Sequence, residues 1–104
     1  MAAPDWHLAF ASDAVPANGM RETIVKYRDI AVARAGDKLY AFGALCPHAA
    51  APLARHGELN GCMLTCTHHS WRFDLEDGGC EIYGNRGLTM YAVKEENGAV
   101  YVLV

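Results

Sequence analysis

Two short motifs place cysteine and histidine side chains close together near the middle of this 104-residue chain. The first is Cys46-Pro47-His48, and the second is Cys66-Thr67-His68-His69. Two thiolates and two imidazoles can hold a [2Fe–2S] cluster, with the cysteines on one iron and the histidines on the other. The same kinds of donor also bind zinc tetrahedrally, but the C-x-H half is a poor match to zinc-finger spacing. The motifs therefore predict a metal centre built from two loops, each of which supplies one cysteine and one histidine.

The second motif leaves a choice between two histidines. His68 follows Cys66 by two residues and His69 follows it by three, so either imidazole is within reach of the same loop tip. The cysteines are less ambiguous, because thiolates are needed to hold ferric iron. We therefore expect Cys46 and Cys66 to share one iron.

The remaining histidines and cysteines lie outside both motifs. His7 and His56 are interpreted as surface or loop histidines. Cys62 and Cys80 are interpreted as ordinary small core or loop residues, because cytoplasmic chemistry keeps such thiols reduced.

Length, composition and charge describe one small, mildly acidic domain. A chain of 104 residues has room for one core and one grafted site, so we expect a single domain over residues 1–104. Hydrophobic residues make up 52% of it, which is enough for it to fold alone. The net charge of −3 gives no support to binding of nucleic acid or of an anionic membrane.

The sequence shows no targeting or membrane signal. Its first six residues lack the basic start and apolar run of a secretory signal. No apolar stretch approaches the roughly 20 residues that span a bilayer. We therefore expect a cytoplasmic protein without a membrane anchor.

The elements that must position the motifs are short strands separated by turn signals. Turns are predicted at Pro16–Gly19, at Ala35–Lys38 and at Glu95–Gly98, where Asn-Gly is the strongest short hairpin signal. A helical turn is allowed near Pro4–Asp5 or Ala11–Ala14, and nothing demands a long helix. Alternation and β-branched residues predict strands over 6–10, 21–27, 29–34, 39–42, 70–74, 91–94 and 100–103.

These patterns predict an all-β fold with two parts. Predicted strands on both sides of the motifs form an antiparallel β-sandwich base. The motif half, about residues 44–74, is a smaller cluster-binding subdomain inserted into that base.

Residues 46–74 resemble the cluster-binding part of Rieske proteins, and the final hairpin fits the base domain of that family. The resemblance implies the Rieske fold and one Rieske-type [2Fe–2S] cluster per chain. The second loop of the family's motif uses the longer spacing, so Cys46, His48, Cys66 and His69 are implied as ligands, with His68 beside them. The size resembles that of Rieske ferredoxins best.

The resemblance also carries an expectation about the redox potential. High-potential family members have serine and tyrosine hydroxyls near the cluster and a disulfide between the loops. The matching positions hold Trp71 and Phe73, and no extra cysteine stands in the bridging places. This implies a potential toward the low end of the Rieske range of roughly −150 to +300 mV.

The pattern Cys-x-x-His-x-Trp-x-Phe is similar to that of the ferredoxins of diiron aromatic and alkene monooxygenases. This implies an electron carrier and not an enzyme. Its partners would be a flavin (FAD) and iron–sulfur NADH reductase and a terminal diiron hydroxylase. A monomer suits a carrier that must present one face to two partners in turn.

Other interpretations remain open from the sequence. The carrier could instead serve a ring-hydroxylating dioxygenase, and a structural zinc module is the alternative of another class. A dioxygenase large subunit also needs a mononuclear iron site, for which the chain is too short. Nitrite reductase small subunits sometimes lack the ligands, whereas all four are present here.

Two smaller questions concern the surface around the motifs. Trp71 is either a wall of the core or part of the docking face. Four acidic residues after the second motif either steer docking or form a solvated turn; they are Asp74, Glu76, Asp77 and Glu81.

Overall fold

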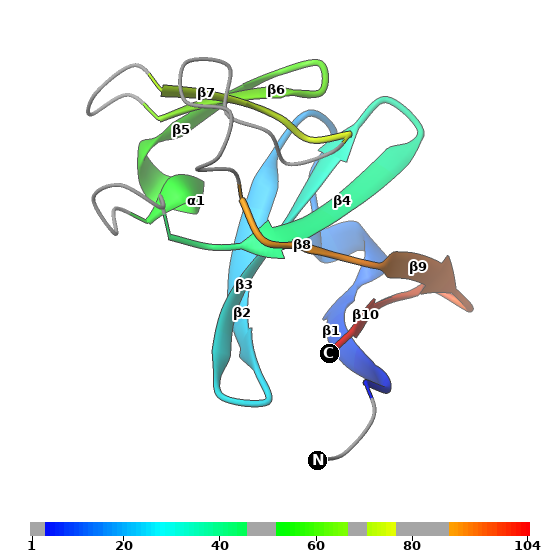
Figure 1. Cartoon of the computed structure of the whole chain (residues 1–104). Helices are drawn as coiled ribbons and strands as arrows, with labels where there is room; N and C mark the ends of the chain where they lie inside the picture. The colour runs from blue at the N-terminus through cyan, green and yellow to red at the C-terminus, as the bar shows by residue number, and fades with distance from the viewer. Residues whose placement is uncertain (1–3, 46–51, 67–70, 77–87) are drawn as a thin grey trace.

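The computed structural model describes residues 4–45, 52–66, 71–76 and 88–104 (Figure 1). Within these ranges the chain forms short antiparallel strands, one four-residue α-helix and one 3-10 turn. The expected all-β fold is confirmed. The strands make three sheets of three, four and three strands.

The four-stranded sheet lies in the middle of the fold. Its order is β2 (Met20–Val25), β3 (Arg28–Ala35), β4 (Lys38–Gly43) and β8 (Met90–Tyr91). Successive side chains of a strand point to opposite faces, and in the middle of β3 both faces are buried. The sheet can therefore support one layer on each side.

One face of the central sheet packs against the base sheet. That sheet has the order β1 (Trp6–Ala11), β10 (Ala99–Leu103) and β9 (Val93–Glu96). Burial of branched aliphatic side chains from both sheets stabilises this layer. Its buried core consists of Val15, Val25, Ile30, Val32, Ala41, Val100, Val102 and Val104.

The other face supports the part of the chain that carries the second motif. Helix α1 (Leu53–His56) leads into a sheet of β5 (Gly57–Asn60), β6 (Met63–Cys66) and β7 (Trp71–Asp74). Figure 1 shows this sheet at the opposite end of the molecule from β1, β9 and β10. The core beneath it consists of Ala31, Ala33, Tyr40, Phe42, Ala44, Leu53, Leu64, Cys66, Phe73, Leu75 and Leu88.

Three of the predicted turns are confirmed. Gly19 donates its backbone N–H to the carbonyl of Pro16, at 3.1 Å. Gly36 has a φ of 61° between β3 and β4, and Asn97 and Gly98 have φ values of 51° and 76° between β9 and β10. Asparagine and glycine adopt this left-handed conformation at low cost, which is why the turns were visible in the sequence.

The end of the strand predicted over 21–27 is wrong. Strand β2 ends at Val25, and Lys26 and Tyr27 form the turn into β3 with φ values of 53° and 66°. Neither residue is favoured in that conformation, so the pairing of β2 with β3 imposes it. The side chain of Tyr27 is fully exposed at the tip.

The strand predicted over 91–94 is confirmed except at Ala92, where it is divided between two sheets. Tyr91 pairs with Ala41 in the central sheet, whereas Val93 pairs with Val102 in the base sheet. Ala92 between them accepts a 2.9 Å hydrogen bond from the backbone N–H of Leu103. The chain thus passes from one layer to the next without a turn signal.

Two further predictions can be compared with the structure. A short 3-10 helix covers Ser12–Ala14, as the sequence allowed, whereas Asp5 is not helical and pairs its backbone with Val104. In the described parts of the chain, no helix has the length and apolar character needed to cross a bilayer.

Candidate metal centre

Cys66 is the one predicted ligand that falls within the described residues. It is the last residue of β6, and its side chain is fully buried in the core beneath β5, β6 and β7. Its backbone pairs with Gly57 on one side and Trp71 on the other. The thiol is therefore held by the middle strand of a three-stranded sheet.

The other three predicted ligands, Cys46, His48 and His69, lie outside the described residues, as does His68. For this reason the described residues include no group of three or more side chains able to hold a metal ion. The backbone on either side of both motifs is described, and it shows which residues pair at the two ends of each motif segment.

Paired residues stand at both ends of each motif segment. Leu45 and Pro52, which flank residues 46–51, form an isolated antiparallel bridge. The N–H of Leu53 then donates a 2.8 Å hydrogen bond to the carbonyl of Ala44. In the second motif, Cys66 pairs with Trp71 across residues 67–70. Each motif segment therefore begins and ends at a pair of bonded residues, which we call its closed base: Leu45 with Pro52 for the first motif, and Cys66 with Trp71 for the second.

A short path of contacts joins the two bases. The backbone N–H of Gly57, at the end of α1, donates a hydrogen bond to the carbonyl of Leu53. Gly57 then pairs with Cys66 in the sheet. Ala44, Leu53 and Cys66 also belong to the same buried core, so the two bases pack as one unit.

Gly57 is a glycine for a steric reason. A Cβ atom there would lie 2.5 Å from the carbonyl oxygen of Leu53 and 2.8 Å from Cδ1 of Leu64. Both separations are too short for real carbon contacts, and one involves a backbone atom that cannot move away cheaply. The close approach of α1 to β6 requires this glycine, which the sequence analysis did not identify.

A polar contact braces the far end of the same sheet. The hydroxyl of Tyr40, in β4, donates a 2.6 Å hydrogen bond to Oε1 of Glu76, which follows β7. Lys38 Nζ lies 3.4 Å from both oxygens of that carboxylate. The hydrogen bond to Glu76, together with burial, raises the pKa of Tyr40 to about 12, and it lowers the pKa of Glu76.

The brace bears on the acidic residues that the sequence analysis singled out. Glu76 is engaged by Tyr40 and Lys38, and Asp74 accepts a 2.9 Å hydrogen bond from the backbone N–H of Glu76. Both carboxylates therefore have a structural role at the end of β7. Asp77 and Glu81 lie outside the described residues.

Two predictions about other cysteines and histidines can be compared with the structure. Cys62 is half-buried and packs against the core that contains Cys66, as expected of a core residue. His7 was expected on the surface or in a loop, but it lies half-buried within β1. Cys80 and the side chain of His56 fall outside the described parts.

The described residues fit a cluster that is held partly inside the protein. Among the described residues, the buried side chains of the core around Cys66 carry no charge, and Tyr40 contributes a hydroxyl that is bonded to Glu76. A thiolate in such surroundings is costly unless a metal ion compensates its charge. The donor set of two cysteines and two histidines suits two irons with unlike ligands.

The comparisons with known proteins agree with this fit. A family model described as "Rieske [2Fe-2S] domain" matches residues 5–92. The methanesulfonate monooxygenase ferredoxin subunit of Methylosulfonomonas methylovora is 31% identical over 100 residues, covering 94% of this chain and 79% of that protein.

Solved structures match over most of the chain. The ferredoxin of carbazole 1,9a-dioxygenase from Nocardioides aromaticivorans IC177 has a TM-score of 0.81 at 25% identity, covering 97% of each chain. A complex of reduced oxygenase and oxidized ferredoxin in carbazole 1,9a-dioxygenase contains a chain with a TM-score of 0.83 at 28% identity. The match covers 94% of this chain and 92% of that one. The fold also matches longer chains, of which this chain spans only 26–28%.

Proposed function

Because the chain belongs to the Rieske [2Fe–2S] domain family, we propose that its two motifs hold the cluster of a ferredoxin that delivers electrons to a terminal oxygenase. The cofactor of the chain is a Rieske-type [2Fe–2S] cluster. The chain is an electron-transfer component of an oxygenase system, and not an enzyme. When bound, the cluster supplies reversible uptake of one electron.

The proposed ligands are one cysteine and one histidine from each motif. Cys46 and Cys66 bind one iron, and His48 and His69 bind the other. The observation that carries this proposal is the place of Cys66, fully buried at the closed base of the second motif and packed with the base of the first. Residues 44–74 then form the cluster-binding subdomain of a single domain.

The described residues would act by holding the ligands in place. The bridge of Leu45 with Pro52 and the pair of Cys66 with Trp71 fix the ends of the two motifs. The core around Cys66 excludes water from one side of the site. Rigid support of this kind keeps the reorganisation that accompanies electron transfer small, because ligands locked by packing move little.

The proposed potential lies toward the low end of the Rieske range. Phe73 occupies the position at which high-potential family members carry a tyrosine, and its side chain is fully buried in the core. Without a hydroxyl at position 73 or 71, fewer donors stabilise the extra charge of the reduced state. Such a potential suits electrons that come from a reduced flavin.

The proposed partners are a flavin and iron–sulfur NADH reductase and the diiron hydroxylase of a hydrocarbon monooxygenase. The similarity to a monooxygenase ferredoxin subunit supports a monooxygenase. A second candidate is a ring-hydroxylating dioxygenase, which the likeness to the carbazole 1,9a-dioxygenase ferredoxins favours. We further propose that the chain works in the cytoplasm as a monomer.

Reconstitution with purified partners tests the function. The protein should be reduced by NADH only when the reductase is present, and the reduced protein should then support turnover by the oxygenase. Metal analysis of that oxygenase separates a diiron hydroxylase from a Rieske dioxygenase. A colourless protein that contains zinc and no iron would instead identify a structural zinc module.

A further inference from the structure

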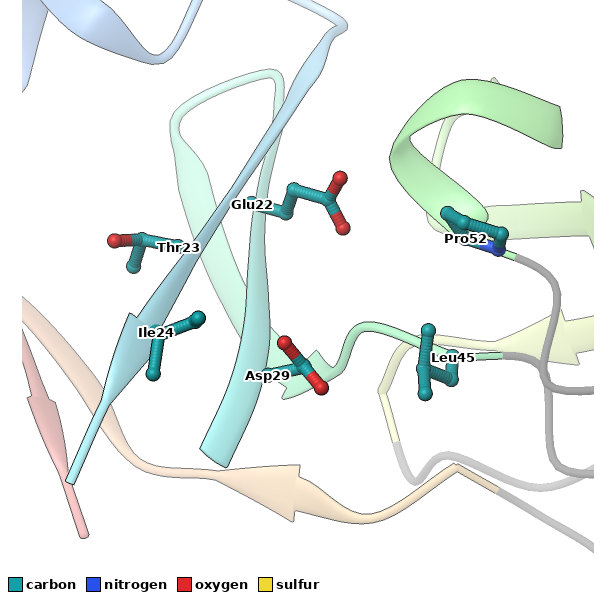
Figure 2. A pocket seen from close by; sticks show the side chains of 6 residues that line it. All are labelled: Glu22, Thr23, Ile24, Asp29, Leu45 and Pro52. Atoms are coloured by element: carbon teal, nitrogen blue, oxygen red, sulfur yellow. The ribbon is translucent and has the colours of Figure 1, made fainter. Parts of the chain in front are cut away.

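An open groove of about 630 Å³ lies directly beside the first motif. One of its walls is formed by Leu45 and Pro52, the residues on either side of segment 46–51 (Figure 2). These two residues are paired with each other, so this wall is the closed base of the motif. A molecule bound in the groove would therefore contact the residues that flank segment 46–51, which contains two proposed ligands.

The opposite wall is the exposed end of the β2–β3 hairpin. Ile24 in β2 lies directly opposite Asp29 in β3, and Glu22 lies two residues before Ile24 on the same face. Figure 2 shows these side chains on one side of the groove, with Leu45 and Pro52 on the other. Further along this face, Met20 packs against the core that contains Cys66. The groove lies beyond Met20 on this face, alongside Glu22 and Ile24.

The groove exposes apolar surface that a free protein would normally bury. The side chain of Ile24 is 69% exposed and that of Leu45 is 40% exposed, and Pro52 lines the groove on the same side as Leu45. Apolar residues gathered in a groove indicate contact with another molecule more strongly than the same residues scattered over a surface.

The groove also carries two negative charges that remain available. Among the described residues, no ion pair or hydrogen bond engages the side chain of Glu22 or Asp29. Lys26, in the adjoining turn, is directed away from the groove, because its ammonium group donates a 3.4 Å hydrogen bond to the carbonyl of Val104. Within the described part of the chain, the two carboxylates are therefore left to pair with a cationic group, which another molecule can supply.

We propose that this groove is the docking site for the terminal oxygenase, which places an arginine between the two carboxylates and apolar side chains against Ile24 and Leu45. An arginine fits because its guanidinium pairs with carboxylates while its stem covers apolar surface. Docking here brings the oxygenase against the base of the first motif. The inference rests on the proposed function, because it presumes a carrier with an oxygenase partner.

The test is a double variant, Glu22→Gln with Asp29→Asn, in oxygenase turnover driven by NADH and reductase. The partner proteins are those purified from the cells in which the chain occurs. At low ionic strength, the concentration of variant that gives half-maximal turnover should rise about tenfold, with little change in kcat. The difference should shrink as salt is added, because salt screens exposed charges. Ile24→Thr, which keeps the β-branch, should also raise this concentration.

A matched control removes two charges elsewhere. Asp13→Asn with Asp37→Asn alters the net charge equally, and both residues are exposed, Asp13 in the short 3-10 helix and Asp37 in the β3–β4 turn, where neither lines the groove. This control should behave like the unaltered protein. Equal losses in both double variants would overturn the proposal, because only the overall charge would then matter.

Three further results show whether the groove assignment, its occupant or the underlying carrier function has failed. If the unaltered protein contains no iron–sulfur cluster, the carrier function itself is wrong. If the Glu22 and Asp29 variant has a normal cluster and the usual concentration dependence, only the groove assignment is wrong. Slower reduction by the reductase with an unchanged oxygenase step would assign the groove to the reductase and overturn the occupant proposed.

Discussion

Gly57 and Cys66 face each other across the β5–β6 ladder, and the glycine leaves no room for a side chain. Its place is set by the carbonyl of Leu53 on one side and the side chain of Leu64 on the other. Leu53 is tied in turn to Ala44, just before the first motif. The pairing of Gly57 with Cys66 therefore connects the residues that flank the first motif with those that flank the second.

Replacing Gly57 with alanine should weaken this junction. Overpacking at a site that cannot relax should cost about 1–3 kcal/mol of unfolding free energy. We also expect less iron per purified chain, because the bases of the two motifs would move apart. Urea denaturation and iron analysis measure the two effects.

Gly43→Ala provides the control for that substitution. A Cβ at Gly43 meets only the Cβ of Thr89, at 3.9 Å, so alanine fits there. If Gly57→Ala retained the stability and iron content of the unaltered protein, the close approach would not be needed to hold the site.

The Tyr40–Glu76 brace should make stability depend on pH in the alkaline range. The pKa of Tyr40 is raised from 10.0 to about 12, so the folded state favours the neutral phenol. The stabilisation is complete below pH 10, where the unfolded chain keeps its phenol neutral too. It is lost as the pH rises through about 12. Stability should therefore fall more steeply above pH 10 than it does in a Tyr40→Phe variant.

The same variant should be less stable at neutral pH. Losing the hydrogen bond to Glu76 should cost about 1 kcal/mol of unfolding free energy. Denaturation curves from pH 7 to 12 measure both effects, with Tyr101→Phe as the control, since no hydrogen bond engages that phenol among the described residues. If the unfolding free energies of Tyr40→Phe and the unaltered protein changed in parallel with pH, the Tyr40–Glu76 hydrogen bond would not contribute to stability as described.

Local signals in the sequence predicted much of the fold, and the failures have physical causes. The Asn97-Gly98 turn could be predicted because those residues accept a left-handed backbone. The Lys26–Tyr27 turn could not, because strand pairing overrides the preference of both residues. The break at Ala92, where the chain leaves the central sheet and joins the base sheet, could not be predicted either, because it depends on packing and not on local sequence.

The sequence proposes the donors of the candidate site, but it does not reveal the contacts that support them. Spacing alone singled out Cys66, whose burial at the end of β6 the structure then described. The brace joins Tyr40 and Glu76 across 36 residues of sequence, and such a contact leaves no local pattern. Gly57 likewise looks like any other glycine until α1 and β6 are packed together.

The choice of histidine can be tested by substitution. His69→Cys should shift the visible spectrum and lower the reduction potential, because a thiolate would replace an imidazole on the second iron. His68→Ala should leave both unchanged. The reverse pattern would move the ligand assignment to His68.

A hydroxyl at position 73 should raise the potential. Phe73→Tyr adds a donor at the position where high-potential family members carry one, and donors near the cluster favour the reduced form. Direct electrochemistry measures the shift, with Phe10→Tyr in β1 as a distant control. Because Phe73 is fully buried, the variant's unfolding free energy should be measured alongside. A correctly folded variant with an unchanged potential would contradict the assignment of this position.

Low-temperature EPR of the dithionite-reduced protein, purified without added metal, tests the central claim most directly. A cluster with cysteines on one iron and histidines on the other should give a rhombic signal whose average g value lies below that of the free electron. That signal should disappear when Cys66 is replaced with alanine. An EPR-silent reduced protein that contains zinc and no iron would contradict the assignment of a Rieske cluster and of electron transfer.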